Sequence, residues 1–239
     1  MRILLIFILV TTFLPGVFAK NRRSNAHLYS HYLKGLFFIQ NGDHERGLTE
    51  LKRAKAKDPE SVHLRLRLAT ILIRLGKTDE AEKLLKEAQR IAPDNLEISL
   101  ALIFIYSYAQ KDEALEAEYE TLLEKAHQLK PDDRSISEYL GQFYFYKKRT
   151  EEAVKIYETI LTKNPEYIEA YFWLGFLYSE KGERDRAVAM WKKGLEIAPD
   201  HAPTLNSLGY TYAEEGVHLD DAETMIKKAL EQEPNNGAY

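Results

Sequence analysis

The sequence predicts an all-α protein, a solenoid of six helical hairpins, and three observations predict it. Six of the eight prolines recur at nearly constant spacing, several glycines share that spacing, and apolar residues between them recur with a helical period. The composition agrees, because 45% of the 239 residues are hydrophobic and only 12 are glycine. Such a composition suits ordered helices better than a disordered chain.

The charge balance and the lack of cysteine exclude several classes of function. The chain has 33 lysines and arginines against 37 aspartates and glutamates, so its net charge is −4. It does not have the basic footprint of a nucleic-acid-binding protein. Without cysteine there is no disulfide framework, thiolate nucleophile, cysteine-ligated zinc or iron–sulfur cluster. We therefore expect a partner recognised by shape and apolar contact, and no nucleic acid.

The amino-terminal segment has the layout of a secretory signal peptide over residues 1–19. One arginine precedes a largely apolar run over residues 3–14, a Pro-Gly break follows, and small residues lie one and three positions before the expected cleavage site. A spanning helix needs about 20 uninterrupted apolar residues. We expect cleavage and export to the periplasm or the extracellular space. The alternative is an uncleaved membrane anchor of residues 3–19, because three cations in residues 20–23 resist translocation. Membrane contact is expected only in that case.

The prolines divide the rest of the chain into hairpins. Successive separations of 34, 38, 34, 34 and 35 residues hold for Pro59, Pro93, Pro131, Pro165, Pro199 and Pro234. Within each period two bursts of apolar residues at helical spacing flank a short polar turn such as Gly76-Lys77. Proline cannot continue a helix, so each one ends a hairpin. The predicted hairpins are 28–61, 62–95, 96–133, 134–167, 168–201 and 202–236, after a linker of residues 20–27.

The hairpins resemble the tetratricopeptide repeat family. The fifth carries Tyr171-x-x-Leu174-Gly175-x-x-Tyr178, then Ala187-x-x-x-Trp191, then Pro199. The sixth repeats the pattern with Leu205, Leu208, Gly209, Tyr212, Ala222, Ile226, Ala229 and Pro234. The resemblance covers about residues 26–236. It implies a right-handed α-solenoid of about six tetratricopeptide helix–turn–helix repeats that acts as a protein-interaction scaffold or adaptor.

The resemblance also implies a binding groove. In this family the fifth and ninth positions of each first helix face the concave side. Carried over by position, these residues are Tyr32, Leu36, Leu66, Thr70, Leu100, Phe104, Glu138, Gln142, Phe172, Phe176, Asn206 and Tyr210. Apolar and aromatic side chains predominate, which suits an extended peptide or an amphipathic helix. The alternative is that these rings merely pack against the next repeat. The Lys and Asn pair with which chaperone-tail-binding repeats clamp a terminal carboxylate is absent from these positions.

Two places depart from the period. The third hairpin is four residues longer, about one helical turn. We expect that turn in a second helix from Asp112 to Leu129, with Ala114 or Ala117 making the close contact. Either the extension is simply tolerated, or the hairpin projects to bend the solenoid or meet a partner. At the other end, residues 237–239 match the start of a truncated further repeat. No polar capping helix follows the sixth hairpin, so we expect its last apolar face, at Met225, Ile226 and Leu230, to be partly bare.

Sites for catalysis or cofactors are not predicted. His27 and His31 have a spacing that can share a metal on a helix, but the sequence assigns no third ligand. Neither a phosphate-binding loop nor a nucleophile elbow occurs. We predict a non-enzymatic scaffold in bacterial cell-envelope assembly or secretion. The alternatives are a regulatory or targeting arm of a larger enzyme, with its catalytic domain beyond residue 239, and a sugar- or lipid-binding solenoid, which the scarcity of polar groove residues disfavours.

Overall fold

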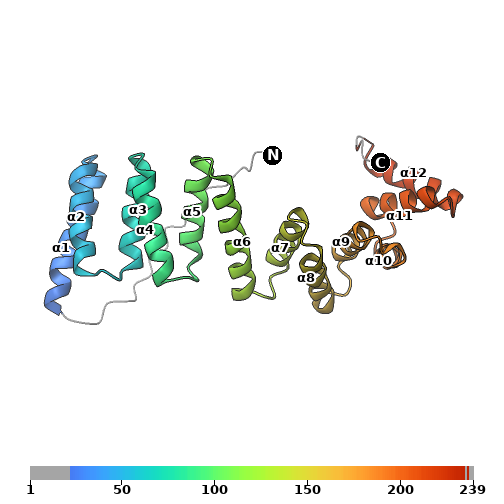
Figure 1. The fold of residues 1–239 in the computed structure, drawn as a ribbon, viewed down its shortest axis with the longest axis horizontal. Coiled ribbons are helices and arrows are strands. Elements are labelled where there is room, and N and C mark those ends of the chain that lie inside the picture. The colour runs from blue at the N-terminus through green and yellow to red at the C-terminus, as the bar shows by residue number, and fades with distance from the viewer. Residues whose placement is uncertain (1–21, 235, 237–239) are drawn as a thin grey trace. The chain divides into compact units, whose positions relative to one another are not determined.

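The computed structural model describes residues 22–234 and 236, and within them the protein consists of α-helices joined by turns, with no strand (Figure 1). The all-α prediction is confirmed. The predicted signal peptide and the predicted start of a further repeat at residues 237–239 lie outside the described residues. None of the described helices is long and apolar enough to cross a membrane.

Twelve helices in the described residues form six successive hairpins. They are α1 (Arg22–Gln40), α2 (His44–Lys57), α3 (Val62–Arg74), α4 (Thr78–Ile91), α5 (Leu96–Tyr108), α6 (Asp112–Leu129), α7 (Arg134–Tyr146), α8 (Thr150–Lys163), α9 (Ile168–Glu180), α10 (Arg184–Ile197), α11 (Ala202–Glu215) and α12 (Leu219–Gln232). The first helices of hairpins two to six begin at the predicted boundaries. Helix α1 extends into residues 22–27, where we expected a linker, because this stretch contains no proline or glycine to stop the helix.

Side-chain caps begin some of the helices, and left-handed glycines follow some of them. Helix α7 starts at the N-cap Asp133, whose carboxylate accepts a hydrogen bond from the Ile136 amide at 3.3 Å. After α9 the chain turns at Gly182 with a φ of +74°, a left-handed conformation that glycine adopts without strain. The Glu183 amide then bonds back to the Tyr178 carbonyl at 2.8 Å, which satisfies one of the last carbonyls of the helix.

Glycines at the helix crossings let large rings pack inside each hairpin. A Cβ atom built on Gly141 of α7 would lie 2.9 Å from the Tyr157 ring of α8. On Gly175 of α9 it would overlap the indole of Trp191 in α10. Both rings are buried, and the Trp191 indole donates a hydrogen bond to the Phe172 carbonyl at 3.3 Å. The close approach of the helices in hairpins four and five therefore depends on glycine.

Two compact units divide the chain after Ile98, within α5. In the first unit α2 packs against both α1 and α3, and α3 against α4. In the second unit α6 packs against α7, α8 against α9, and α10 against α11, so each hairpin covers the apolar side of its neighbour. One continuous core in this unit runs from Leu123 through Leu140, Leu174 and Leu208 to Ala222. Met225, Ile226 and Leu230 of α12 are half-buried, as expected.

The extra turn of the third hairpin lies in its second helix, as predicted. Helix α6 has 18 residues, whereas α8 has 14. The expected close contact is not found, because Ala114 is half-buried and Ala117 is exposed, while Ala153 at the crossing of the next hairpin is fully buried. Glutamates crowd the first half of α6, and the helix buries only Leu123.

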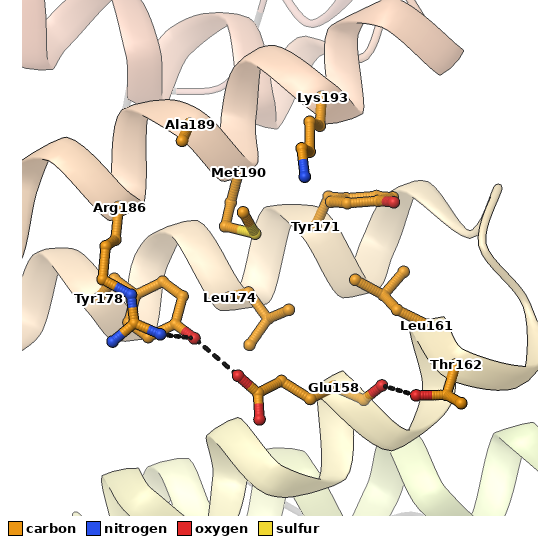
Figure 2. Close-up of a pocket in the computed structure, with 10 residues that line it drawn as sticks. All are labelled: Glu158, Leu161, Thr162, Tyr171, Leu174, Tyr178, Arg186, Ala189, Met190 and Lys193. Atoms are coloured by element: carbon orange, nitrogen blue, oxygen red, sulfur yellow. Dashed lines mark hydrogen bonds between the residues drawn. The ribbon is translucent and has the colours of Figure 1, made fainter.

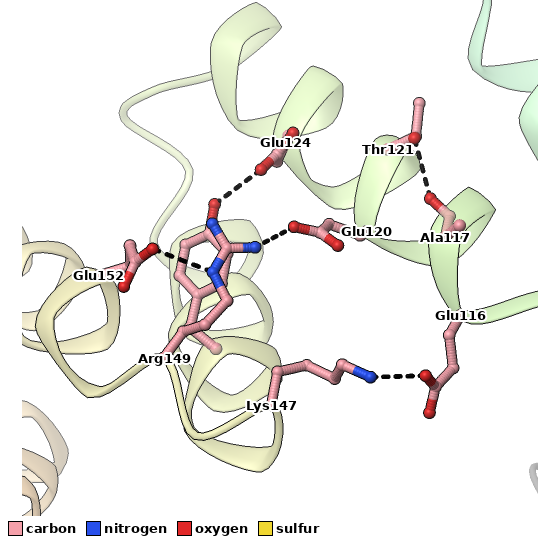
Figure 3. A network of polar contacts seen from close by, with 9 residues as sticks. Glu116, Ala117, Glu120, Thr121, Glu124, Lys147, Arg149 and Glu152 are labelled. Atoms are coloured by element: carbon pink, nitrogen blue, oxygen red, sulfur yellow. Dashed lines mark hydrogen bonds and ion pairs between the residues drawn. The ribbon is translucent and has the colours of Figure 1, made fainter. Parts of the chain in front are cut away.

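Polar contacts join α6 to the following hairpin (Figure 3). Arg149 pairs with Glu120 of α6 and with Glu152 of α8, the latter at 3.0 Å. Its guanidinium lies 4.4 Å from the centroid of the Tyr144 ring. The Tyr144 hydroxyl donates to Glu124 at 2.9 Å. Burial, together with this carboxylate, raises the pKa of Tyr144 to about 12, so the hydroxyl remains a donor at neutral pH.

The same arrangement recurs one repeat later. The Tyr178 hydroxyl donates to Glu158 at 2.9 Å, and the Arg186 guanidinium lies 3.9 Å from the centroid of the Tyr178 ring. In each case the glutamate comes from the preceding hairpin, while the tyrosine and the arginine belong to the following one. This contact of a glutamate, a tyrosine and an arginine therefore joins consecutive repeats. We call it the Glu–Tyr–Arg joint.

A buried carboxylate, Glu50, links the helices of the first hairpin. His31 of α1 lies with its Nδ1 atom 2.6 Å from the Glu50 Oε2 atom, and Arg53 pairs with the other oxygen. The hydrogen bond to His31 and the neighbouring Arg53 lower the pKa of Glu50 below its usual value of 4.5, against the opposing effect of burial. His31 is thus engaged by a carboxylate, and within the described residues no cluster of His, Asp and Glu could hold a metal ion.

Glu50→Gln is expected to lower the free energy of unfolding by about 1.5 kcal/mol at neutral pH, the lower end for hydrogen bonds to charged groups. The folded-state pKa is depressed, so this stabilisation is present above the usual value of 4.5 and is lost as the pH falls through the folded pKa. Urea denaturation at neutral pH and at about pH 3 measures the difference. The exposed Glu60→Gln should change stability at neither pH. A Glu50→Gln deficit of equal size at both pH values would contradict the assignment.

Candidate functional site

Aromatic side chains gather on the first helices of hairpins four and five. The Phe145 ring of α7 lies 5.4 Å from the Trp173 ring and 5.4 Å from the Phe176 ring of α9, centroid to centroid. Phe172 lies 5.6 Å from Trp173, and Tyr146 lies 5.6 Å from Phe145. We call these five residues the aromatic face. Four are half-buried, and Tyr146 is 69% exposed.

The aromatic face rests on the core of the second unit. The Trp173 ring stacks on the buried Tyr157 ring with centroids 5.9 Å apart and an interplanar angle of 11°. Phe145 and Phe176 meet edge to face at 83°. Offset and edge-to-face contacts of this kind are favourable and hold the rings in fixed orientations. The rings are therefore positioned before any ligand arrives.

The surface continues toward α11. His201, which caps this helix, has its ring 5.9 Å from the Phe172 ring and its Nδ1 atom 2.7 Å from the Thr204 hydroxyl. Burial lowers the pKa of His201, so the imidazole is neutral at pH 7. Asn206 of α11 is half-buried, and Tyr210 is 62% exposed. This edge of the surface is polar but carries no positive charge from the histidine.

None of the twelve predicted groove residues is fully buried. Nine are half-buried: Tyr32, Leu36, Leu66, Phe104, Glu138, Gln142, Phe172, Phe176 and Asn206. Three are exposed: Thr70, Leu100 and Tyr210. They fall in both units. In the first unit the Tyr32 hydroxyl lies 3.1 Å from His63 Nε2, which joins α1 to α3 at this surface. In the second unit Phe172 and Phe176 belong to the aromatic face.

Phe145, Tyr146 and Trp173 were not among the predicted groove residues. Phe145 and Tyr146 lie three and four positions after Gln142, so they continue the same stripe by one helical turn. The rule of the fifth and ninth positions leaves out this last turn of the first helix. The signal that could have found them is the aromatic run at residues 143–146.

An open pocket of about 450 Å³ lies between α8, α9 and α10 (Figure 2). Its apolar lining includes Leu161, Leu174 and Met190. The Glu–Tyr–Arg joint of Tyr178 closes one end, and Lys193 stands at the other, with no ion-pair partner among the described residues. The pocket can take an apolar side chain beside an anion.

Two family models that describe the tetratricopeptide repeat match the chain. One matches residues 38–107 and 144–209, and the other matches residues 110–168. No curated protein gives a significant match to this chain.

Solved structures of tetratricopeptide repeat proteins resemble this one. YrrB, described as having an unusual peptide-binding site, is 19% identical over 78% of this chain and 93% of its own, with a TM-score of 0.50. A tetratricopeptide repeat protein from Parabacteroides merdae ATCC 43184 is 21% identical over 86% of this chain and 79% of its own, with a TM-score of 0.43. MamA from Desulfovibrio magneticus RS-1 is 15% identical over 88% and 97%, with a TM-score of 0.39. Because the first family model alone covers more than half of the residues, the chain belongs to the tetratricopeptide repeat family.

Proposed function

We propose that this protein is a non-catalytic scaffold that binds an extended peptide segment of a partner protein across the aromatic face. The observation that carries the proposal is that five rings on α7 and α9 contact one another, with Trp173 stacked on the buried Tyr157, yet keep part of their surface open to solvent. A peptide-binding site is also named for YrrB, whose fold this chain shares.

The chemistry of the surface suits a peptide. Aromatic rings bury a large apolar area and lose little side-chain entropy on binding, which is why they dominate interaction hot spots. Rings that are already held in place reduce the cost of binding further. The side-chain amides of Gln142 and Asn206, on the helices α7 and α11, can donate to and accept from the main chain of an extended segment.

The proposed setting is the bacterial cell envelope, in assembly or secretion. The support for this setting is the order of charge, apolar run, helix breaker and small residues in the first nineteen positions, which is the order of an export signal. Scaffolds of this kind hold partners without acting on them chemically.

Phe172→Ala/Phe176→Ala is expected to weaken binding by about 10–100-fold, since truncating central aromatic anchors removes most of the apolar contact. Peptides selected by display against the full chain supply the ligands, and fluorescence anisotropy of the labelled peptides gives the dissociation constants. Circular dichroism checks that the variant stays helical.

A matched control removes one leucine and one phenylalanine elsewhere. Leu33 and Phe37 of α1 are spaced four residues apart, like Phe172 and Phe176, and are 61% and 63% exposed. Leu33→Ala/Phe37→Ala should leave the dissociation constants unchanged. Unchanged binding by Phe172→Ala/Phe176→Ala, or equal weakening by both double variants, would refute the aromatic face as the site.

A further inference from the structure

The first helices of the two units carry opposite charges. Helices α7, α9 and α11 of the second unit contain five glutamates, one on α7 and two on each of the others, against the single arginine Arg134. Helix α3 of the first unit contains three arginines and no carboxylate. We propose that the aromatic face takes a cationic segment, in which lysine or arginine alternates with apolar residues. This proposal rests on the peptide-binding function proposed above and specifies the partner chemistry.

Two carboxylates on the helices of the aromatic face form no ion pair with a cation among the described residues. Glu138 lies on the stripe of α7 that leads through Gln142 to Tyr146, and it accepts a hydrogen bond from the Tyr167 hydroxyl. Glu169 precedes Phe172 by three residues on α9, so the two share one side of the helix. Both are half-buried, and neither forms an ion pair with a lysine or arginine among the described residues. A cation from a partner would neutralise them.

The rings themselves can receive a cation. The chain places its own guanidinium groups over tyrosines where they can reach, for example Arg134 at 4.2 Å from the Tyr167 centroid. Within the described residues, the five rings of the aromatic face have no such cation over them. Tyr146, the most exposed of the five, and Tyr210 on α11 are 69% and 62% exposed, so an incoming ammonium or guanidinium group could reach their ring faces.

Arg184 pairs with Glu214 at 3.0 Å and with Glu215 at 3.5 Å, so the two glutamates of α11 are already offset. The lysines of the neighbouring turns do not pair with Glu138 or Glu169. Lys147 pairs with Glu116 at 2.5 Å, and Lys181 pairs with Glu151 at 2.9 Å and with Glu183 at 2.8 Å. Lys148 is exposed, but it follows α7 and is ten residues from Glu138, about 15 Å along a helix. The open pocket between α8 and α10 carries the opposite sign at Lys193. Replacing Lys193 therefore tests whether a cationic peptide binds in this pocket instead of on the aromatic face.

The experiment compares three synthetic peptides that share the same leucines and differ only in lysine, glutamine or glutamate at the other positions. The full chain is titrated with each labelled peptide, and anisotropy gives the dissociation constants. The lysine peptide should bind about tenfold more tightly than the glutamine peptide, the combined effect of exposed ion pairs and a cation–π contact. The glutamate peptide should bind more weakly still, and salt should reduce the difference.

Glu138→Gln/Glu169→Gln should bring the lysine and glutamine peptides to within about twofold of each other, because the isosteric amides keep the hydrogen bonds but lose the charge. Glu196→Gln/Glu231→Gln is the matched control. It removes two exposed glutamates from α10 and α12, changes the net charge equally, and should keep the tenfold preference. Lys193→Ala should also leave the preference intact.

Each contrary result has a distinct meaning. Equal affinity of wild type for all three peptides overturns the cationic preference, and so does a preference that survives Glu138→Gln/Glu169→Gln. If Phe172→Ala/Phe176→Ala then still weakens all three peptides, the peptide-binding function stands without the charge selectivity. If that variant binds all three as wild type does, the aromatic face is not the site and both proposals fail.

Discussion

Trp191→Ala should lower the free energy of unfolding by about 3–5 kcal/mol, the range for removing a buried tryptophan. The side chain is only 2% exposed, and it fills the space that Gly175 leaves open between α9 and α10. Its indole also holds the Phe172 carbonyl at 3.3 Å. Alanine would leave a cavity that the rigid crossing of two helices cannot close. Urea denaturation followed by circular dichroism measures the loss.

Lys193→Ala serves as the control on the same helix. It lies two residues away from Trp191 but is exposed, so its replacement should change stability by no more than about 0.5 kcal/mol. A Trp191→Ala variant as stable as this control would show that the crossing of α9 and α10 does not depend on the indole.

Leu51→Ala should cost about 2–5 kcal/mol, because the side chain is completely buried and packs against Gly35. The loss should be local. Trp173 and Trp191, the only tryptophans, both lie in the second unit, whereas Leu51 lies in the first. Stability in repeat proteins is approximately a sum of repeat and interface contributions. We therefore expect the unfolding transition to shift more in circular dichroism than in tryptophan fluorescence.

The exposed Leu33→Ala in the same unit controls for the loss of apolar surface as such. It should leave both transitions close to those of the wild type. Identical shifts of the two signals in Leu51→Ala would show that the whole chain unfolds in one step, which would contradict the local origin of the effect.

The hairpins could be predicted from the sequence because their ends are set by local chemistry. A proline ends a helix unless it lies in the first turn, as Pro203 does in α11, and a turn such as that at Gly182 needs a left-handed residue. The proline spacing also showed that the third hairpin has four extra residues, which the structure places in α6. The start of α1 could not be predicted, because nothing in residues 22–27 marks a boundary. The contact expected from Ala114 or Ala117 failed because it depended on the register of two helices, which proline spacing does not determine.

The candidate site was predictable only in part. Helical spacing and family resemblance identified Phe172 and Phe176, but the cluster also includes Phe145 from the preceding hairpin. That contact depends on how two repeats stack and which rotamers their rings adopt, and neither follows from one residue's position. The stacking of Trp173 on Tyr157 is of the same kind. The charged residues of each helix can be read from the sequence. That Glu138 and Glu169 form no ion pair among the described residues can be seen only from their neighbours in the structure.

The Glu–Tyr–Arg joint has a consequence for the order in which hairpins can be combined. Glu124 and Glu158 each meet the tyrosine of the next hairpin, but the equivalent position in the fifth hairpin holds Lys192, 5.7 Å from the Tyr212 ring centroid. A duplicated fifth hairpin would set Lys192 of one copy beside Tyr178 and Arg186 of the next. Two like charges would then meet where the native chain has a carboxylate. The side chain at this position therefore determines which hairpin can follow without bringing like charges together. Hairpins four to six are for this reason not interchangeable.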